Sequence, residues 1–168
     1  MKSILVIGET CQDNFVYCNA KRLAPDIPVP VLEINRQVQN PGMAMNVQRN
    51  ILQFEKNCDL LTNPDWETMT KTRYVHESTN HTFLRIDTPH VVQPLTEEQI
   101  SLDYDVIVIS DYNKGCISYE LVEQVLQQFR GPVFIDTKKT DLARFECAFV
   151  KINSLENSLA KTLPSQTI

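Results

Sequence analysis

The sequence predicts an α/β fold, in which a mainly parallel sheet lies between two layers of helices and a small second β-sheet is added. Short, almost wholly apolar runs recur along the chain, as is typical of strands buried on both faces. Helical patterns lie between these runs, and strands that alternate with helices form parallel sheets with right-handed crossovers. Two further stretches do not follow this alternation, and they predict the second sheet.

The strands of the main sheet are expected where the apolar runs occur. These are residues 3–7, 104–109, 132–135 and 147–152, with a weaker run at 57–61. Isoleucine and valine are frequent in them, which favours strands over helices of the same length.

The helices are expected from apolar side chains that recur at helical spacing. Residues 43–54 place Met43, Val47, Ile51 and Phe54 on one face. Residues 96–99 fit a capping box that opens a short helix. Residues 119–129 form a helix with Ser118 as its N-cap, and residues 154–160 begin another.

The second sheet is expected from residues 15–39 and 69–87. The first stretch contains three prolines and strand-like pieces at 15–18 and 29–34. The second reads as a hairpin with strands at 70–75 and 82–86 around a polar turn.

Composition places the chain among soluble, intracellular globular proteins of about one domain. The 168 residues carry a formal net charge of −5, and 42% of them are hydrophobic. An acidic balance argues against nucleic-acid and membrane binding. Five scattered cysteines without a Cys-x-x-Cys pair indicate reduced thiols and no zinc site. The first residues contain no signal peptide, and no apolar run is long enough for a membrane span.

Polar residues follow each strong strand, and ligands of parallel sheets bind beyond the carboxyl ends of the strands. The segments concerned are residues 8–14, 110–115, 136–139 and 153–156. In any one of them the acids and amides can equally be helix caps, but four together favour a binding site. The chain contains neither Gly-x-Gly-x-x-Gly nor a P-loop motif, so a dinucleotide-binding or P-loop enzyme is not supported. Lys71, Arg73 and Arg85 on the hairpin predict either a solvated face or contact with a phosphorylated substrate.

The motifs, taken in order, resemble the N-terminal half of the ribokinase-like (PfkB-type) carbohydrate kinases. The resemblance is carried by GETCQDNF, KRLAPDIPVPVLE, NPGMAMNVQRNI, TKTRYV with FLRID, SDYNKG, FIDTKKTD and INSLE. It is strongest to the branch that phosphorylates D-glycero-β-D-manno-heptose 7-phosphate at its anomeric hydroxyl for ADP-heptose and lipopolysaccharide core synthesis. It covers nearly the whole chain and implies one truncated ribokinase-like domain, residues 1–168, that is cytoplasmic and uses ATP and Mg²⁺.

The resemblance also implies functional residues. The positions that match substrate-binding residues of the family are Asp13, Gly42, Asn46, Arg85, Asp111, Lys114 and Lys138. Asn153 and Glu156 match an Asn-x-x-Glu motif that supports Mg²⁺ and the ATP phosphates. Residues 16–39 and 69–87 correspond to a β-sheet lid, which in relatives closes over the sugar and often forms the dimer interface. A phosphorylated sugar and a homodimer are therefore the expected partners.

The sequence departs from the family pattern at several points. Glu9 stands where the family has aspartate, Met43 replaces the second glycine of a pair, and Thr137 replaces a proline. The stretch between Leu61 and Met69 is shorter than in relatives. The family's catalytic aspartate lies in a Gly-Ala-Gly-Asp motif that does not occur here, so no catalytic residue is assigned.

Three interpretations follow. The first is a sugar kinase of which this chain is either a fragment or one half of a split enzyme completed by a second polypeptide. The second is a non-catalytic module for sugar-phosphate binding or dimerisation, and the third is an unrelated doubly wound binding domain.

Overall fold

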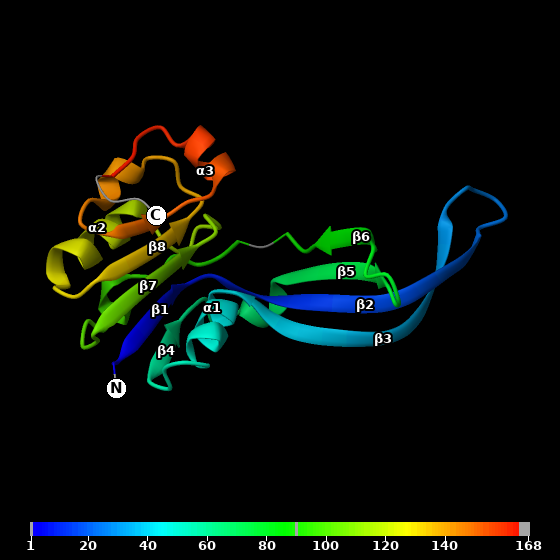
Figure 1. The fold of residues 1–168 in the computed structure, drawn as a ribbon, viewed down its shortest axis with the longest axis horizontal. Coiled ribbons are helices and arrows are strands. Elements are labelled where there is room, and N and C mark those ends of the chain that lie inside the picture. The colour runs from blue at the N-terminus through cyan, green and yellow to red at the C-terminus, as the bar shows by residue number, and fades with distance from the viewer. Residues whose placement is uncertain (1, 90, 165–168) are drawn as a thin grey trace. The chain divides into compact units, whose positions relative to one another are not determined.

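The computed structural model describes residues 2–89 and 91–164, which fall into two compact units (Figure 1). The first unit comprises Met1–Thr10, Met43–Pro64 and Val91–Ile168. The second comprises Cys11–Gly42 and Asp65–His90, and so contains both segments expected to form the lid.

The first unit is built on a five-stranded sheet whose neighbouring strands all pair in parallel. In spatial order the strands are β4 (Cys58–Leu61), β1 (Ile4–Gly8), β7 (Val106–Asp111), β8 (Val133–Thr137) and β9 (Phe149–Lys151). Each lies where an apolar run predicted it, with its ends shifted slightly. The predicted α/β fold with a mainly parallel sheet and a small second sheet is confirmed.

Strand β1 of the main sheet is buried on both of its faces. On one face Val6 packs against Ala44, the first residue of helix α1 (Ala44–Ile51). On the other face Leu5 and Ile107, which are partners in register, are also buried. Since neither face of β1 meets water, its sequence is a continuous apolar run, whereas β8 buries alternate residues and exposes Phe134 on its other face.

Helix α2 (Tyr119–Gln128) confirms the predicted helix and its cap. The Oγ atom of Ser118 accepts a hydrogen bond from the backbone N–H of Leu121 at 3.0 Å. The helix then buries Val122 and Val125 together with Leu121. The cap satisfies one backbone N–H that would otherwise have no partner within the helix.

The remaining helices are short. They are η1 (Trp66–Thr68), η2 (Glu97–Gln99), η3 (Leu142–Phe145) and α3 (Ser154–Leu159). The predicted capping box at the start of η2 is present, with the side chains of Thr96 and Gln99 reciprocally bonded to the backbone. Of the helices in residues 2–89 and 91–164, none is long and apolar enough to cross a membrane.

The second unit is built on a four-stranded mixed sheet. Its strands are, in spatial order, β3 (Pro30–Met43), β2 (Thr10–Leu23), β5 (Thr70–His76) and β6 (Thr82–Asp87). Strands β2 and β5 pair in parallel, whereas β5 and β6 form the predicted antiparallel hairpin. Strands β2 and β3 are far longer than the predicted pieces at 15–18 and 29–34. Much of β3 is exposed, so no apolar run marks its length.

The predicted helix at residues 43–54 is too long at both ends. Met43 is the last residue of β3 and has φ 56°, outside the helical region. Phe54 lies beyond the end of α1 and is 92% exposed. Met43 and Phe54 fit the apolar spacing of a helix, although both lie outside α1.

Candidate functional site

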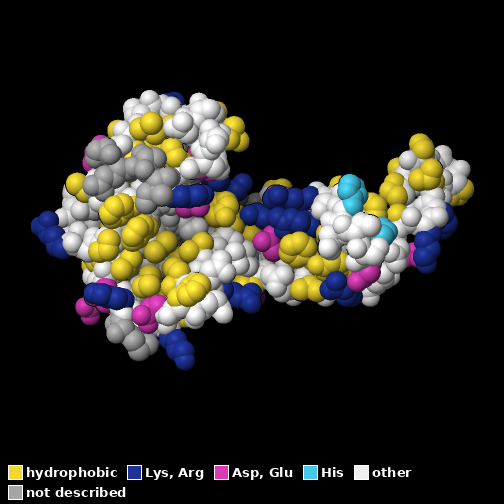
Figure 2. Space-filling model, viewed as in Figure 1, with side chains coloured by type: hydrophobic (Ala, Val, Ile, Leu, Met, Phe, Trp, Pro, Cys, Tyr) yellow, Lys and Arg dark blue, Asp and Glu magenta, His cyan; other side chains and the backbone are white. Residues whose placement is uncertain are grey.

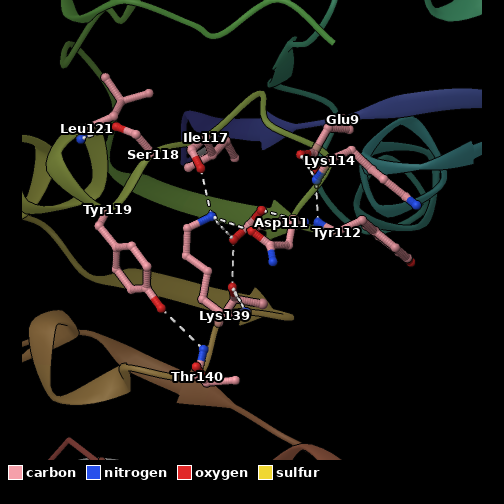
Figure 3. Close-up of polar contacts among 12 residues, drawn as sticks. Glu9, Asp111, Tyr112, Lys114, Ile117, Ser118, Tyr119, Leu121, Lys139 and Thr140 are labelled. Atoms are coloured by element: carbon pink, nitrogen blue, oxygen red, sulfur yellow. Dashed lines mark hydrogen bonds and ion pairs between the residues drawn. The ribbon is translucent and has the colours of Figure 1, made fainter. Parts of the chain in front are cut away.

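A buried ion pair lies at the carboxyl ends of β7 and β8 (Figure 3). The ammonium of Lys139 donates to Oδ2 of Asp111 at 2.8 Å and to the carbonyl oxygen of Ile117 at 2.7 Å. The hydroxyl of Thr137 donates to the same Oδ2 atom at 2.6 Å. The side chains of Asp111 and Lys139 are only 1% and 4% exposed. The pair therefore joins the loops that follow the two strands, and each charge has its partner inside the chain.

Glu9 is a second buried acid at this edge of the sheet (Figure 3). It follows β1 directly, and its carboxylate accepts the backbone N–H groups of Tyr112 at 2.8 Å and Lys114 at 3.0 Å. Successive N–H groups that point to one side form an anion-binding concavity. Here the anion is the chain's own carboxylate, which holds in place a loop whose Asn113 has φ 56°.

Two predicted substrate residues, Asp111 and Lys114, belong to this edge in different ways. The Oδ1 atom of Asp111 accepts the backbone N–H of Asn113 at 2.8 Å, and its Oδ2 atom is engaged by Lys139. Both carboxylate oxygens of Asp111 therefore already accept hydrogen bonds from the chain itself, and the side chain is only 1% exposed. Lys114 is exposed, and its backbone N–H donates to the carboxylate of Glu9.

The Asn-x-x-Glu segment forms a capping box at the start of α3. Oδ1 of Asn153 accepts the N–H of Glu156 at 2.9 Å, and Oε2 of Glu156 accepts the N–H of Asn153 at 2.8 Å. The other carboxylate oxygen of Glu156 accepts a hydrogen bond from the ammonium of Lys138, which raises the pKa of that lysine. This arrangement satisfies the helix start and holds Lys138 beside it.

These residues do not fit Mg²⁺ as direct ligands in this arrangement. Mg²⁺ takes oxygen ligands, usually one or two carboxylates together with water and phosphates. Both oxygens of Glu156 are already engaged, so direct ligation requires that Lys138 leave. Within residues 2–89 and 91–164, no three His, Cys, Asp or Glu side chains are grouped as metal ligands.

In the second unit, one face of the four-stranded sheet carries a cluster of three cations and two carboxylates from β2, β5 and β6. The residues are Asp13, Lys71, Arg73, Arg85 and Asp87, and we call this the charged face. In register, Asp13 lies opposite Lys71, Lys71 opposite Asp87, and Arg73 opposite Arg85. Partners in register share a face, as do alternate residues of one strand, so the five side chains project to the same side. Figure 2 shows Lys and Arg side chains gathered over β5 and β6, with acidic side chains beside them.

Asp13 and Gly42 are adjacent on this sheet. Oδ1 of Asp13 accepts a hydrogen bond from Nη1 of Arg73 at 2.8 Å, and these side chains are 22% and 25% exposed. A Cβ atom at Gly42 would lie 2.5 Å from Oδ2 of Asp13 and 2.9 Å from Sγ of Cys11. The lack of a side chain at Gly42 therefore provides the space that the Asp13 carboxylate occupies.

Arg85 and Asp87 form another ion pair of the charged face. Nε and Nη2 of Arg85 donate to the two carboxylate oxygens of Asp87 at 2.6 Å and 2.7 Å. These hydrogen bonds lower the pKa of Asp87. Burial raises the pKa of the Cys11 thiol, on which Lys71 and Asp13 also act.

The structure thus divides the predicted site residues into separate groups. Asp13, Gly42 and Arg85 lie at the charged face, and Asp111 and Lys114 lie at the edge of the parallel sheet. Lys138, Asn153 and Glu156 form a third group. Asn46 is exposed in the first turn of α1 and joins none of these hydrogen-bonded groups.

The sequence reasoning gave no role to Lys139 or Glu9. For Lys139 a signal exists, because Val133, Ile135 and Thr137 alternate as the buried residues of β8 and Lys139 continues that alternation. For Glu9 the signal is weaker: an acid placed directly after a strand that is buried on both faces.

Comparison with known proteins places the chain near carbohydrate kinases. No protein-family model matches it. It is 27% identical to the bifunctional protein HldE of Helicobacter pylori (strain Shi470) and 30% identical to that of Escherichia coli O9:H4 (strain HS), in each case over 86% of the chain. The matches cover 39% and 37% of those relatives, so the chain spans less than half of their length.

Solved structures agree on the fold. A ribokinase from Thermotoga maritima superimposes with a TM-score of 0.64 at 17% identity, over 93% of this chain and 61% of the other. Phosphofructokinase-2 from Escherichia coli in complex with fructose-6-phosphate gives a TM-score of 0.62 at 18% identity, over 94% and 63%. The chain therefore also spans less than two thirds of these structures.

Proposed function

We propose that this chain, which is homologous to the bifunctional HldE proteins and has the ribokinase-like fold, is the sugar-binding part of a carbohydrate kinase. The proposed ligand is a phosphorylated sugar of the heptose 7-phosphate class. The observation that supports it most is the charged face, where a largely buried carboxylate, Asp13, lies beside Gly42 and among three cationic side chains.

The chemistry of the charged face suits such a ligand. A carboxylate accepts hydrogen bonds from hydroxyl groups, and Asp13 is the acid that the family resemblance assigns to the sugar. Guanidinium groups bind phosphate through two parallel hydrogen bonds, and Arg73 and Arg85 offer two of them on one face. Asn46, Asp111, Lys114 and Lys138 stay predicted substrate residues, and Asn153 and Glu156 stay predicted residues of the ATP and Mg²⁺ site.

In the complete kinase the proposed reaction is transfer of the ATP γ-phosphoryl group to the anomeric hydroxyl of the heptose 7-phosphate. Such transfer depends on positioning of the two substrates and on electrostatic stabilisation, with Mg²⁺ neutralising phosphate charge. The task we assign to this chain is to hold and orient the acceptor sugar. Cytoplasmic ADP-heptose synthesis is the proposed setting.

A second candidate is a non-catalytic module that binds sugar phosphates. The observation that favours it is that Asp111, a predicted substrate residue, is held inside the chain by the ammonium of Lys139. The two candidates differ in whether a second polypeptide supplies the remaining kinase elements.

A homodimer through the second unit is part of the proposal. The sheet and its connecting turn expose several large apolar side chains: Leu23, Ile27, Val29, Ile34, Leu84 and Ile86. Exposed apolar side chains are also found at protein–protein interfaces, and the sheet has edge strands that could pair with another copy.

Calorimetric titration of D-glycero-D-manno-heptose 7-phosphate tests the proposal. We expect the wild type to bind and Asp13→Ala to bind roughly ten- to hundredfold more weakly, because a hydrogen bond to a charged group contributes about 1.5–3 kcal/mol. Asp26→Ala, at an exposed position of the same unit, is the matched control. Equal affinity of Asp13→Ala and wild type contradicts the assigned site, and no binding by the wild type contradicts the function. ATP-dependent turnover by the chain alone contradicts the non-catalytic alternative.

A further inference from the structure

The loop that follows β7 is held by two buried carboxylates, to which three successive backbone N–H groups donate. Those of Tyr112 and Lys114 donate to Oε2 and Oε1 of Glu9 at 2.8 Å and 3.0 Å. The N–H of Asn113 donates to Oδ1 of Asp111 at 2.8 Å. Hydrogen bonds to an ionised acceptor are about twice as strong as those between neutral groups. The backbone of the loop is therefore fixed at each of these three residues.

Glu9 is itself held in place by the elements around it. The residue before it, Gly8 of β1, is the parallel partner of Ser110 in β7, so Glu9 lies at the same edge of the sheet as Asp111. Its carbonyl oxygen accepts the N–H of Ala44, the first residue of α1, at 2.9 Å. Through Glu9 the loop is thus tied to two other elements of the same unit, β1 and α1.

The contact between Glu9 and the loop needs both oxygens and the full length of the side chain. Each carboxylate oxygen accepts one of the two N–H groups. A glutamine at this position has a single acceptor oxygen, and its NH₂ group cannot accept the second N–H. An aspartate keeps both oxygens but is shorter by one methylene group, and the backbone of residue 9 is fixed. Neither residue can therefore replace glutamate fully.

Lys114 is the residue whose side chain depends most on this loop. It is exposed and extends away from the Glu9 carboxylate (Figure 3). The preceding residue, Asn113, has φ 56°, a conformation that few residues other than glycine adopt. Hydrogen bonds to the N–H groups on both sides of Asn113 hold the chain in this conformation. They therefore also set the direction in which the Lys114 side chain leaves the loop.

We infer that Glu9 is a positioning residue that presents the ammonium of Lys114 to the sugar phosphate. The inference rests on the proposed function, in which Lys114 is a substrate residue, and it gives the buried carboxylate a role in binding without contact to the ligand. Ordering a loop on binding lowers affinity, and a loop that is already ordered avoids this cost. Glu9 should therefore raise the affinity for the sugar phosphate only when the Lys114 ammonium is present.

A double-mutant cycle tests this, with calorimetric titration of D-glycero-D-manno-heptose 7-phosphate as the measurement. We expect Glu9→Gln and Lys114→Met each to bind roughly tenfold more weakly than the wild type. The double variant should bind no more weakly than Lys114→Met, because a residue that acts through Lys114 has no effect once its ammonium is removed. A merely structural role of Glu9 would weaken binding by the same factor in both backgrounds.

Backbone amide exchange measures the contact between Glu9 and the loop without the ligand. In Glu9→Gln the N–H groups of Tyr112 and Lys114 should exchange with solvent faster than in the wild type, as followed by NMR. Asp105→Asn is the matched control, because the Asp105 carboxylate also accepts a backbone N–H, that of Ser3 at 2.8 Å, but precedes β7 at the opposite edge of the sheet. It should change neither the exchange at the loop nor the affinity.

The outcomes separate the inference from the proposed function. If the wild type binds heptose 7-phosphate and Glu9→Gln binds it equally well, the inference is wrong and the function stands. The same conclusion follows if Glu9→Gln weakens binding by one factor in both backgrounds, or if the exchange of Tyr112 and Lys114 is unchanged. If the wild type does not bind the sugar phosphate, both the function and the inference are refuted. Should Glu9→Gln fail to fold, Glu9→Asp, which keeps the buried charge, takes its place in both measurements with the same expected results.

Discussion

Lys139 and Asp111 form an ion pair that is almost fully removed from water, with Nζ and Oδ2 2.8 Å apart. Charges of this kind are tolerated inside a protein only when hydrogen bonds satisfy their remaining donors and acceptors. Thr137 and the carbonyl of Ile117 provide such bonds here. The pair therefore fixes the conformation of the edge at which two predicted substrate residues lie.

Lys139→Met should destabilise the chain by about 3–5 kcal/mol, because it leaves Asp111 buried without a counter-charge. The double variant Lys139→Met, Asp111→Asn should recover much of this loss, since the uncompensated charge is then removed. Urea unfolding followed by circular dichroism measures both. Lys138→Met is the matched control at the neighbouring lysine, whose side chain is 44% exposed, and should cost only about 0–1 kcal/mol. A Lys139→Met variant as stable as the wild type contradicts the prediction.

The sequence predicted the parallel sheet because its strands are apolar, most clearly β1, which is buried on both faces and leaves the run at residues 3–7. It did not predict the length of β3, because exposed strands need no such pattern and are held by backbone hydrogen bonds to neighbours. The parallel pairing of β2 with β5 joins segments about sixty residues apart, and no local pattern records it.

The candidate site was predictable only in part. Motif order assigned Asp13, Gly42 and Arg85, and the structure places them at one sheet. The partners of these residues were not assigned, because a motif gives positions and not side-chain contacts. Of the two consecutive lysines, the family motif assigned Lys138 to the substrate. In the structure the buried lysine is Lys139, and it forms the ion pair with Asp111.

Gly42→Ala should weaken binding of heptose 7-phosphate by roughly tenfold or more, because its Cβ would meet the Asp13 carboxylate at 2.5 Å and displace it. The cost in stability should be about 1–3 kcal/mol, as for other small overpacking changes. Calorimetry and urea unfolding give the two quantities. In an Asp13→Ala background the same substitution should cause no further loss of affinity. Full additivity of the two losses indicates that Gly42 does not act through Asp13.

The loss of folding stability at acidic pH should depend on Arg144, whose guanidinium donates hydrogen bonds to Glu120 and Glu123. These bonds hold the pKa of both glutamates below the ordinary value of 4.5. A carboxyl whose pKa is lower in the folded state adds stability above its unfolded pKa, and this is lost as the pH falls through the folded value. When the pH falls from neutral to below about 4.5, the free energy of unfolding should therefore decrease less for Arg144→Met than for the wild type. Urea midpoints at neutral pH and at about pH 3 measure the difference, and parallel pH profiles contradict it.

Ser118→Ala should destabilise the chain by about 1 kcal/mol, because the N–H of Leu121 loses its cap at the start of α2. Ser118→Asp should retain most of the stability, since aspartate is an equally good N-cap and its charge suits a helix N-terminus. Thermal and urea unfolding measure both variants. Equal loss in the two variants indicates that the hydroxyl is needed for something other than capping.

The proposed homodimer should depend on the face of β6 that lies opposite the charged face. Leu84 and Ile86 are about half exposed and alternate with Arg85 and Asp87 along the strand, so they project to the other side of the sheet. Leu84→Asp with Ile86→Asp should convert a dimer into a monomer, because burying two carboxylates in an apolar interface is strongly unfavourable.

Sedimentation equilibrium measures this change, and calorimetry with heptose 7-phosphate shows whether the charged face is intact. Phe54→Asp is the matched control, because Phe54 is 92% exposed but belongs to the first unit. It should leave the dimer unchanged. Since the two aspartates lie on the face away from Arg85, the double variant should keep its affinity for the sugar phosphate. A wild type that stays monomeric at high concentration, or a double variant that stays dimeric, contradicts an interface on this face.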